Sequence, residues 1–479
     1  MHALVMVSVG MLVLLSLPYW LPAAVLALRV RIFTRINGEE GIPIPGKLVD
    51  ASRFRQVYSN PAASGRSRGA ALSNLFWYWL APGPEMHQEH LENGPKYEAV
   101  ARTTRRILGM QRKTAEDLAT ACTLRVVERQ NIRDVAVVRL RDLMMPIWAE
   151  FYYEVVFGAL CPLRARQLIV DNANDVVTAL KCCSLRHMEK RERLTQFLIG
   201  KLQRREVPHE LPERLSTEEK AFYLQGTYFN TAVVQMSEAM VHLMMVIAQH
   251  PEIQARLASD SQDDSYLDRV ITETFRMYPL FGISHRITSA EIAVDEHGSI
   301  PAGSVLCFNH PEYHRTGFAD PDRFDPDRWL KLAPLDEHYI PFGVAANRPC
   351  PAMGLAPVTM RTAARALLDH YAFYSSASHS RSIPNRGPCL AVSRATGCEP
   401  RMRTMVLLFV KLRDRWEDVG RSLVQLVLGT YMVWDARRLR LCDTYFDGQE
   451  LVAETAKEVS SARACPYSAP AEDRSPVHK

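Results

Sequence analysis

The feature that most limits how this chain can fold is an uncharged, strongly apolar stretch close to its beginning. From Ala3 to Leu28 there is no Asp, Glu, Lys, Arg or His. At about 1.5 Å per helical residue, the stretch is long enough to cross the roughly 30 Å hydrocarbon core of a bilayer. Basic residues follow at once, at Arg29, Arg31 and Arg35, whereas only His2 precedes it. The positive-inside tendency therefore predicts a single-pass anchor with the rest of the chain in the cytoplasm.

Two other placements of the stretch remain open. A cleaved secretory signal would begin with basic residues, which are missing here, and would have a shorter apolar run. Pro18 and Pro22 would kink a spanning helix, so the stretch could also lie obliquely in one leaflet. We interpret residues 1–30 as the anchor. Residues 31–48, which are basic and contain the sequence GIPIPG, are interpreted as a stiff hinge.

The whole chain has the composition of a packed globular protein. Of its 479 residues, 47% are hydrophobic and 23% are charged, which is too apolar for a disordered chain. The net charge of +5 comes from basic residues scattered among acids, so the sequence predicts no nucleic-acid binding. The ten cysteines form no CxxC pair and no zinc-type spacing. This pattern favours reduced thiols over a disulfide framework.

Apolar residues recur at helical spacing through much of the chain. The spacing predicts helices over residues 97–131, 132–161, 215–251 and 266–277. In the third of these, Ser216 and Glu219 match a capping box, and Pro251 follows the end. Short strand-like runs bounded by Gly and Pro follow at 291–294 and 304–308. The predicted fold class is mainly α with small β-sheets.

Three short patterns then follow one another in order. Glu273 and Arg276 are three residues apart, which places both side chains on one face of a helix. The sequence FDPDRW, Phe324 to Trp329, comes next. The third pattern is IPFGVAANRPCPAMGLA, Ile340 to Ala356, a Gly- and Pro-rich loop that places Cys350 before an apolar helix. Backbone N–H groups and the helix dipole at that position are expected to lower the pKa of the thiol.

Each pattern alone is weak, because Glu–Arg pairs are usually solvated and a lone cysteine is usually an inert core residue. In this order, however, they resemble the cytochrome P450 family over about residues 93–394, and most clearly from Tyr266 onward. The resemblance implies a cytochrome P450 fold for residues 49–394, preceded by the single transmembrane helix. It also implies haem b as the cofactor, with Cys350 as the axial ligand of the iron.

The resemblance assigns roles to further side chains. Those implied to contact the haem are Cys350, Arg348, Phe342, Arg286 and Arg102. Phe342 would pack beside the sulfur, and the arginines would bind the propionates. Those implied to form a buried structural triad behind the haem are Glu273, Arg276 and Arg328. Loss of one triad member would leave an unpaired buried charge, which costs about 3 to 5 kcal/mol.

The chain departs from the family pattern in the middle of the long helix. Oxygen-activating members carry an acid followed by Thr there, whereas this chain has Gln235 and no acid at that register. Gln235 can order a water but cannot itself relay protons as an acid. Asn230 and Thr231, one turn earlier, would replace the pair if the helix bulges. These three residues are the candidates for the oxygen-facing side of the haem.

Two catalytic functions are compatible with this departure. The first, which we favour, is a monooxygenase that takes NAD(P)H-derived electrons from a reductase or ferredoxin. It would insert one oxygen atom from O2 into a lipophilic substrate at a membrane reached through residues 3–28. The second is a peroxygenase, isomerase or dehydratase that needs no reductase. A third, from another class, is a non-catalytic haem-binding sensor.

The resemblance fades near Arg394 and does not explain residues 395–479. Apolar spacing predicts helices over 402–412 and 416–432, and such a tail most often packs on its own domain. Because basic residues flank the apolar face, a membrane-surface helix or a partner-docking site is the alternative. The polar, Pro-containing end, residues 460–479, is expected to be disordered.

Overall fold

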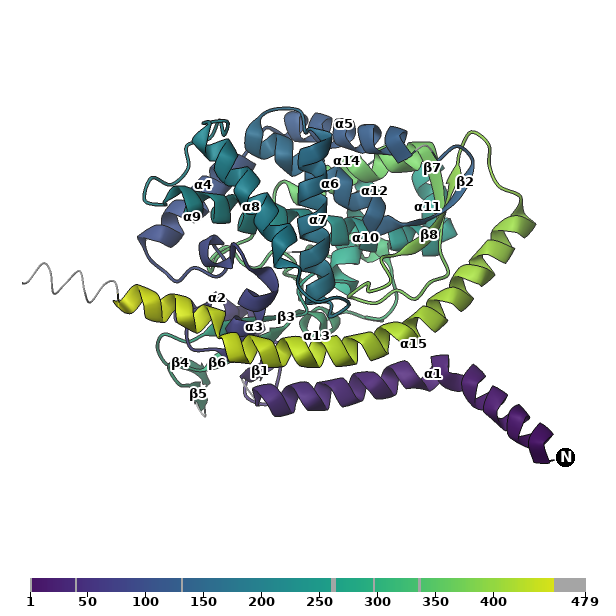
Figure 1. The fold of residues 1–479 in the computed structure, drawn as a ribbon, viewed down its shortest axis with the longest axis horizontal. Helices are drawn as coiled ribbons and strands as arrows, with labels where there is room; N and C mark the ends of the chain where they lie inside the picture. The colour runs from purple at the N-terminus through teal and green to yellow at the C-terminus, as the bar shows by residue number, and fades with distance from the viewer. Residues whose placement is uncertain are drawn as a thin grey trace, which may run out of the picture.

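A computed structural model describes residues 2–451 apart from 39–40, 131, 260–263, 296–297 and 335–336. The end expected to be disordered, 460–479, lies outside the described residues. Helices make up most of the described chain, and short strands form small sheets at its margins (Figure 1). The predicted fold class, mainly α with small β-sheets, is confirmed.

The helices are distributed along the whole chain. The first eight are α1 (His2–Asn37), α2 (Phe54–Ser59), α3 (Ala71–Leu80), α4 (Pro95–Leu108), α5 (Arg112–Gln130), α6 (Leu140–Phe157), α7 (Leu163–Leu180) and α8 (Met188–Gln203). The later ones are α9 (Thr217–Leu224), α10 (Val233–Gln249), α11 (Pro251–Ser259), α12 (Ser265–Met277), α13 (His310–Arg315), α14 (Ala356–His370) and α15 (Pro400–Leu439). There are also a π-helix, η2 (Gln225–Ala232), and two 3-10 helices, η1 (Pro84–Met86) and η3 (Pro326–Leu330), and residues 441–451 are helical as well.

The described strands form three sheets. They are β1 (Ile42–Ile44), β2 (Val135–Arg139), β3 (Ile283–Ile287), β4 (Ile292–Asp295), β5 (Gly298–Ile300), β6 (Val305–Asn309), β7 (Tyr371–Tyr374) and β8 (Pro388–Ser393). In the first sheet, β6 lies between β1, to which it is parallel, and β3, to which it is antiparallel. The second has the order β2-β8-β7, and β4 and β5 form a two-stranded third sheet.

The predicted long helix exists, but it consists of three segments. Ser216 caps α9 and Glu219 completes the capping box, as the sequence predicts. The helix then widens into η2 and narrows again into α10. In α10, nearly every side chain is buried, which explains why this helix is apolar on all sides. The bulge proposed as a condition for a role of Asn230 and Thr231 is therefore present.

Two predicted helices have different boundaries in the structure. The range 97–131 is divided at Gly109 into α4 and α5. The range 132–161 begins with β2, which pairs with β8, so that α6 starts only at Leu140. Helical spacing did not reveal β2, because half-exposed Val135 to Val138 is apolar at every position and fits either period.

Two described helices are long and apolar enough to cross a membrane, Met6–Asn37 and Thr217–Gln249, and the second is mostly buried in the core. The first belongs to α1, whose residues Met6 to Leu15 are fully exposed. Ile42 to Ile44, within the expected hinge, form β1 and pair with Leu306 to Phe308 of β6. This part of the hinge is therefore fixed to the first sheet.

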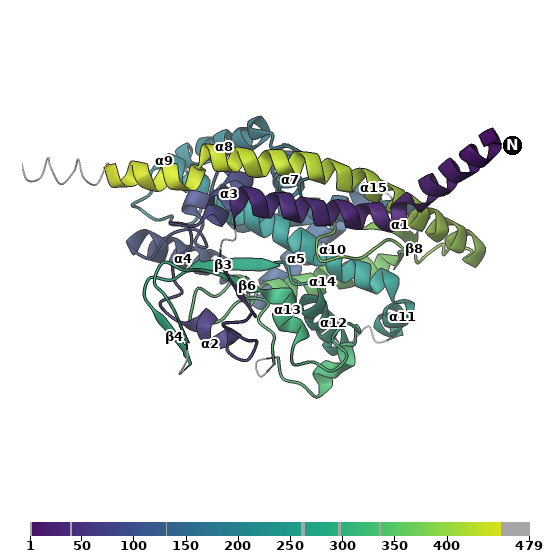
Figure 2. The ribbon, with the colours of Figure 1, turned by 90° about the horizontal axis from the view of Figure 1, so that it is seen from below.

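The tail forms one long helix, α15, where the sequence predicted two shorter ones. Figure 2 shows α15 and α1 lying side by side across one face of the molecule, and their residues contact each other. The α15 side chains Met432, Val433 and Ala436 pack with Leu75 and Tyr78 of α3 in a separate small core. The tail thus packs on its own domain along one side.

Candidate functional site

A large cavity lies between the long helix α9-η2-α10, called the central helix below, the cysteine loop (Ile340 to Ala356) and strand β3. The cavity and the solvent-filled opening that leads into it have a combined volume of about 1300 Å³. The lining is mostly apolar and aromatic, and includes Leu108, Tyr152, Tyr228, Met236, Phe275 and Ile340. Six of the predicted site residues also line it, namely Thr231, Gln235, Arg286, Phe342, Arg348 and Cys350. A concave, largely apolar space with a few polar groups is typical of a small-molecule or cofactor site.

Cys350 stands where the loop returns toward the protein interior. Its backbone N–H donates to the Phe342 carbonyl at 3.0 Å, which closes the loop beside the cavity. Burial raises the pKa of the Cys350 thiol to about 11, and a hydrogen bond from the Ala352 backbone only partly offsets this. The expected lowering of the pKa was wrong, because α14 begins only at Ala356 and its dipole is too distant. A bound metal cation would favour the thiolate.

The three triad residues meet as the sequence predicts. The Glu273 carboxylate is buried and accepts from Arg276 Nε at 2.9 Å and Nη2 at 2.8 Å, and from Arg328 Nε at 3.1 Å. It also accepts from the Trp329 indole N–H at 3.0 Å and from the Asp325 backbone N–H at 3.0 Å. Because these last donors belong to the FDPDRW segment, the carboxylate ties that loop to α12.

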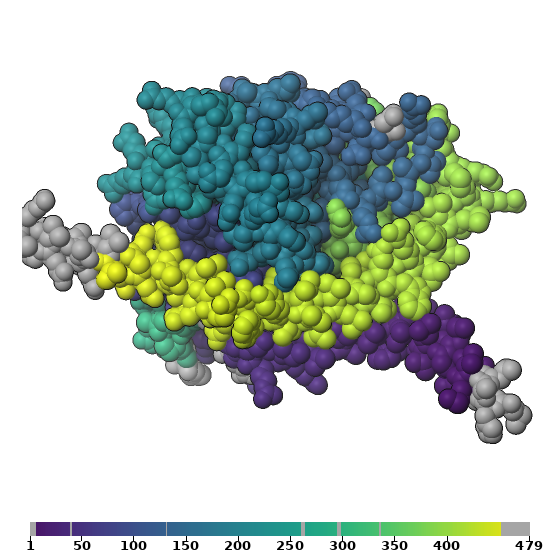
Figure 3. All heavy atoms as spheres, viewed as in Figure 1, coloured from purple at the N-terminus to yellow at the C-terminus, as the bar shows by residue number. Residues whose placement is uncertain are grey.

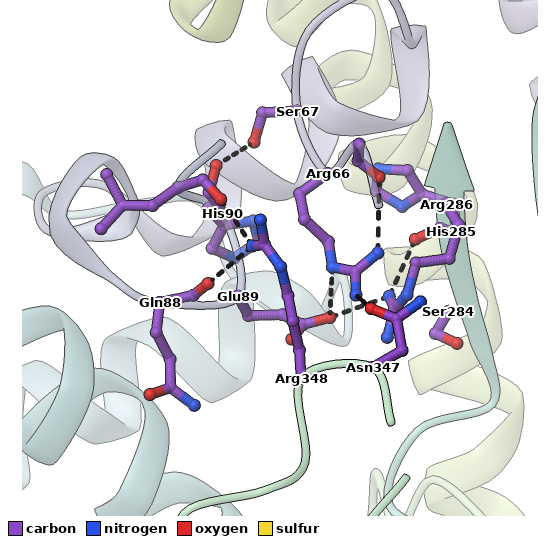
Figure 4. A network of polar contacts seen from close by, with 12 residues as sticks. Arg66, Ser67, Gln88, Glu89, His90, Ser284, His285, Arg286, Asn347 and Arg348 are labelled. Atoms are coloured by element: carbon purple, nitrogen blue, oxygen red, sulfur yellow. Dashed lines mark hydrogen bonds and ion pairs between the residues drawn. The ribbon is translucent and has the colours of Figure 1, made fainter. Parts of the chain in front are cut away.

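Arg286, Arg348 and a third arginine, Arg66, converge on Glu89 at one edge of the cavity (Figure 4). Arg286 Nη1 lies 2.8 Å from Glu89 Oε1, and Arg66 Nε lies 3.6 Å from the same oxygen. Desolvation opposes ionisation of Glu89, but the three arginines outweigh it and lower its pKa to about 2. Glu92 also lies close enough to favour the charged form of Arg348, so three cations face two carboxylates, which leaves a positive surplus in a buried place.

The remaining partners of these arginines are mostly carbonyl oxygens and neutral side chains. Arg348 donates to the Gln88 and Leu91 carbonyls and lies over the Tyr97 ring, 4.0 Å from its centre. Arg286 Nη2 donates to the Tyr58 hydroxyl at 2.8 Å. The Nε atoms of Arg286 and Arg348 are buried and have no hydrogen-bond partner in the part of the chain that the structure describes. The cluster is suited to bind one or two further anions.

Burial and the neighbouring Arg286 lower the pKa of Arg66 to about 9, although Glu89 raises it. The sequence did not indicate Arg66 or Glu89, because they lie far from the cysteine loop along the chain.

Arg102, which was predicted to bind a propionate, lies away from this arginine cluster. It is exposed on α4 and does not line the cavity.

The three candidates on the central helix separate into two groups. Gln235 and Thr231 line the cavity, as does Thr227, whose buried Oγ1 has no hydrogen-bond partner among the described residues. Asn230 does not line it. Its amide nitrogen donates to the Leu80 and Pro82 carbonyls at 2.9 and 2.7 Å, and its oxygen accepts from Asn172. Asn230 therefore holds the π-helix against the loop after α3.

Comparisons with known proteins agree with this arrangement. The family model described as Cytochrome P450 matches residues 164–396. Pentalenene oxygenase of Streptomyces avermitilis is 34% identical over 123 residues, which is 22% of this chain and 27% of that protein. Cytochrome P450 3A17 of Cavia porcellus is 23% identical over 226 residues, 43% of this chain and 44% of that one. The chain thus spans less than half the length of these curated relatives.

Solved structures share the fold at low sequence identity. The retinoic acid bound cyanobacterial CYP120A1 has a TM-score of 0.57 at 14% identity, and covers 71% of this chain and 87% of its own. Cytochrome P450SP alpha in complex with (R)-ibuprophen has a TM-score of 0.59 at 16% identity, covering 71% and 88%. The likeness extends over most of those chains and supports the fold.

Proteins of the cytochrome P450 family bind haem b, and the residues of this cavity fit that group. Two propionates would offset the positive surplus of the arginine cluster, and would give the unpartnered Nε atoms acceptors. The Cys350 thiol, which lines the same cavity, is a suitable iron ligand. The mainly helical fold, the ordered motifs and the family model matched over residues 164–396 show that this part of the chain is similar to the cytochrome P450 family.

Proposed function

We propose that this chain is a haem-thiolate monooxygenase that inserts one oxygen atom from O2 into a lipophilic organic substrate, using NAD(P)H-derived electrons. The observation that carries the proposal is that one cavity is lined by the Cys350 thiol, by Arg286 and Arg348, and by polar side chains of the central helix. Haem held there would supply the redox chemistry and the oxygen-binding iron. Such a cavity has room for an apolar substrate beside the cofactor.

In this proposal each part of the chain has a separate task. Cys350 ligates the iron, Phe342 lies beside it, and Arg286 and Arg348 hold the propionates. Gln235 and Thr231 orient a water molecule near the iron from the central helix, and Thr227 extends this polar row along the same cavity. The apolar lining excludes further water and orients the substrate.

A second function is favoured by the absence of an acid among the residues of the central helix that line the cavity, since Glu238 of α10 is paired with Arg141 and Lys181 outside it. Among the cavity-lining residues the only carboxylate is Glu89, and the arginine cluster holds it. Neither Gln235 nor Thr231 can serve as an acid of the usual strength in a proton relay. A peroxygenase receives its protons with the oxidant, and an isomerase or dehydratase needs none from O2 chemistry. These activities therefore form the alternative proposal.

The iron ligand is tested first. The reduced full-length chain exposed to carbon monoxide should show the red-shifted Soret band that is characteristic of thiolate ligation. Cys350→Ala should lose this band, whereas Cys389→Ala, which changes a buried cysteine outside the cavity, should keep it. A parent chain that folds without binding haem, or a band retained in Cys350→Ala, would refute the proposal.

The electron source is tested next with O-alkyl coumarins of increasing chain length, because their oxidative dealkylation releases a fluorescent phenol. We expect turnover with NADPH and a cytochrome P450 reductase, and Gln235→Thr should increase it by improving proton delivery. Gln203→Thr is the matched control, since Gln203 is exposed at the end of α8 and does not line the cavity. Turnover with hydrogen peroxide alone would favour a peroxygenase, and no turnover with either oxidant would exclude the monooxygenase and the peroxygenase for these probes and leave the isomerase or dehydratase.

We further propose that α1 attaches the enzyme to a membrane, with the catalytic domain facing the cytoplasm and a reductase or ferredoxin as partner. The exposed apolar residues Met6 to Leu15 support the attachment, and Arg29, Arg31 and Arg35 support the orientation. The sequence predicts that this helix crosses the bilayer once. The contacts between α1 and α15 favour a different placement, in which α1 lies along the membrane surface.

A further inference from the structure

Helices α1 and α15 run parallel and contact each other at two separated points. Arg415 Nη1 of α15 donates to the Tyr19 hydroxyl of α1 at 3.1 Å. Farther along, a Cβ atom placed on Gly429 would lie 3.0 Å from the ring of Phe33 and 3.2 Å from Cys182, so any larger residue would push these neighbours away. Tyr19 and Phe33 are separated by the same number of residues along α1 as Arg415 and Gly429 are along α15. The two helices therefore keep one register along their contact.

One side of α15 is fixed to the catalytic domain. Val410, Met432, Val433 and Ala436 are buried there, and Asp414 accepts from Ser378 at 2.7 Å and 2.9 Å. The opposite side carries an exposed apolar stripe. It has two parts, one with Met405, Leu408 and Leu412 and the other with Val424, Val427 and Trp434, and within each part the members are three, four or seven residues apart. A stripe of this kind beside an apolar helix is unusual on a surface that faces water.

The charged residues of α15 are also distributed unevenly between its exposed and its buried side. All charged α15 residues that the structure leaves exposed are basic: Arg401, Lys411, Arg413, Arg415, Arg437 and Arg438. The four acids of α15 are buried or half-buried, and each lies in an ion pair with an arginine. The solvent-facing side therefore combines apolar residues with positive charge, and α1 adds no acid to it. Anionic lipid headgroups complement such a surface.

We propose that α15 is a second membrane-binding helix, which lies with α1 in the surface of the bilayer and forms a two-helix platform beneath the catalytic domain. Figure 3 shows the two helices adjacent along one face of the molecule. The apolar stripe of α15 would enter the boundary between headgroups and acyl chains, and its basic residues would contact the headgroups. This inference rests on the proposed attachment through α1.

The contacts also argue against α1 crossing the bilayer in this arrangement. Between its contact points Arg415 and Gly429, α15 carries Glu417, Asp418 and Arg421. If Tyr19 to Phe33 crossed the hydrocarbon core while packed on α15, these charges would enter the core as well. Charged side chains there are strongly disfavoured. When both helices lie along the membrane surface, their apolar side chains enter the lipid and the charged side chains of α15 stay outside the hydrocarbon core.

The test uses photo-crosslinking of the full-length, haem-loaded chain to lipid. p-Benzoylphenylalanine replaces one residue at a time: Leu12 on α1, Leu408 or Val427 on the α15 stripe, and Leu163 on α7 as the matched control. Leu163 is 58% exposed, close to the 67% of Leu408 and 66% of Val427, but lies on another helix. The vesicles contain phosphatidylcholine with phosphatidylserine, or phosphatidylcholine alone.

We expect lipid adducts at Leu12, Leu408 and Val427 and at least tenfold less adduct at Leu163. Adducts at Leu408 and Val427 should fall several-fold without phosphatidylserine. No adduct at Leu12 would refute the attachment through α1 itself. Adducts at Leu12 without adducts at Leu408 and Val427 would overturn only the platform, as would crosslinks from these two positions to a second copy of the chain.

Discussion

The carboxylate of Glu273 accepts five hydrogen bonds inside the protein, so its neutralisation gives a strong test of the fold behind the haem. Glu273→Gln keeps the size of the side chain, but replaces one acceptor oxygen by a donor and removes the charge. Arg276, whose side chain is 1% exposed, would lose its only ion pair among the described residues and keep a hydrogen bond to the one remaining amide oxygen and a 3.3 Å hydrogen bond to the Arg323 carbonyl. Arg328 would keep three carbonyl partners. Most of the loss therefore falls on Arg276.

Removing one partner of a buried ion pair costs about 3 to 5 kcal/mol, because the other charge stays buried without compensation. We expect Glu273→Gln to lower the free energy of unfolding by this amount. Glu312→Gln changes an exposed glutamate on α13 and should alter it by no more than about 0.5 kcal/mol. The measurement is urea unfolding of the haem-loaded chain in detergent, followed by far-UV circular dichroism and by the Soret band.

The double variant Glu273→Gln/Arg276→Gln separates the charge from the packing. It removes the unpaired guanidinium as well, so its destabilisation should be smaller than the sum of the two single effects by about 1 to 3 kcal/mol. The reasoning fails if Glu273→Gln costs less than about 1 kcal/mol, which is the ordinary effect of a point substitution. It fails equally if the two effects add.

Three further outcomes are expected. Arg286→Ala should weaken haem retention at least tenfold in a transfer assay to apomyoglobin, whereas Arg102→Ala on the exposed side of α4 should not change it. Gly429→Ala should be less stable to urea than Gly420→Ala, whose added methyl group meets open space, by about 1 to 3 kcal/mol; equal stabilities would contradict the α1 contact. Burial lowers the pKa of His310 to about 3, so the unfolded chain binds more protons below pH 6.5 and stability falls as the pH drops from 6.5 toward 3. His310→Gln should reduce the difference in unfolding free energy between pH 7.5 and pH 5, and an unchanged difference would refute the assignment.

The sequence predicts best where chemistry forces a short pattern. The Glu273 network required a carboxylate, two arginines and the FDPDRW turn, and all of them meet in the structure. Ser216 and Glu219 formed the predicted capping box because both partners are three residues apart. In these cases the interacting groups are close in sequence or belong to a known motif.

Prediction was weakest for interactions between distant segments. Arg66 and Glu89 join Arg286 and Arg348 only because the fold brings four segments together, and no local pattern marks either residue. Asn230 was a candidate for the oxygen-facing side from its position along the helix. The π-helix turns its amide toward the Leu80 and Pro82 carbonyls instead. The pKa of Cys350 depended likewise on burial and on where α14 begins.

The tail shows a different limit. Apolar spacing located its helical residues but could not show that 402–412 and 416–432 continue into one helix, because the charged residues between them are compatible with a helix or a turn. Arg413 pairs with Glu417 and Asp414 pairs with Arg421 across this junction, and Glu417 also pairs with Arg139 of β2, which stabilises the continuous form. The last of these pairs depends on the position of β2, which was not predicted.

The pairing of β1 with β6 has a consequence for how the enzyme meets its surroundings. α1 ends at Asn37 and β1 begins at Ile42. Even a fully extended chain covers only about 3.3 to 3.6 Å per residue, so this connection keeps the end of α1 close to the first sheet. That sheet carries Arg286, which lines the cavity. If α1 lies in a bilayer as proposed, the short link therefore holds this end of the cavity near the bilayer.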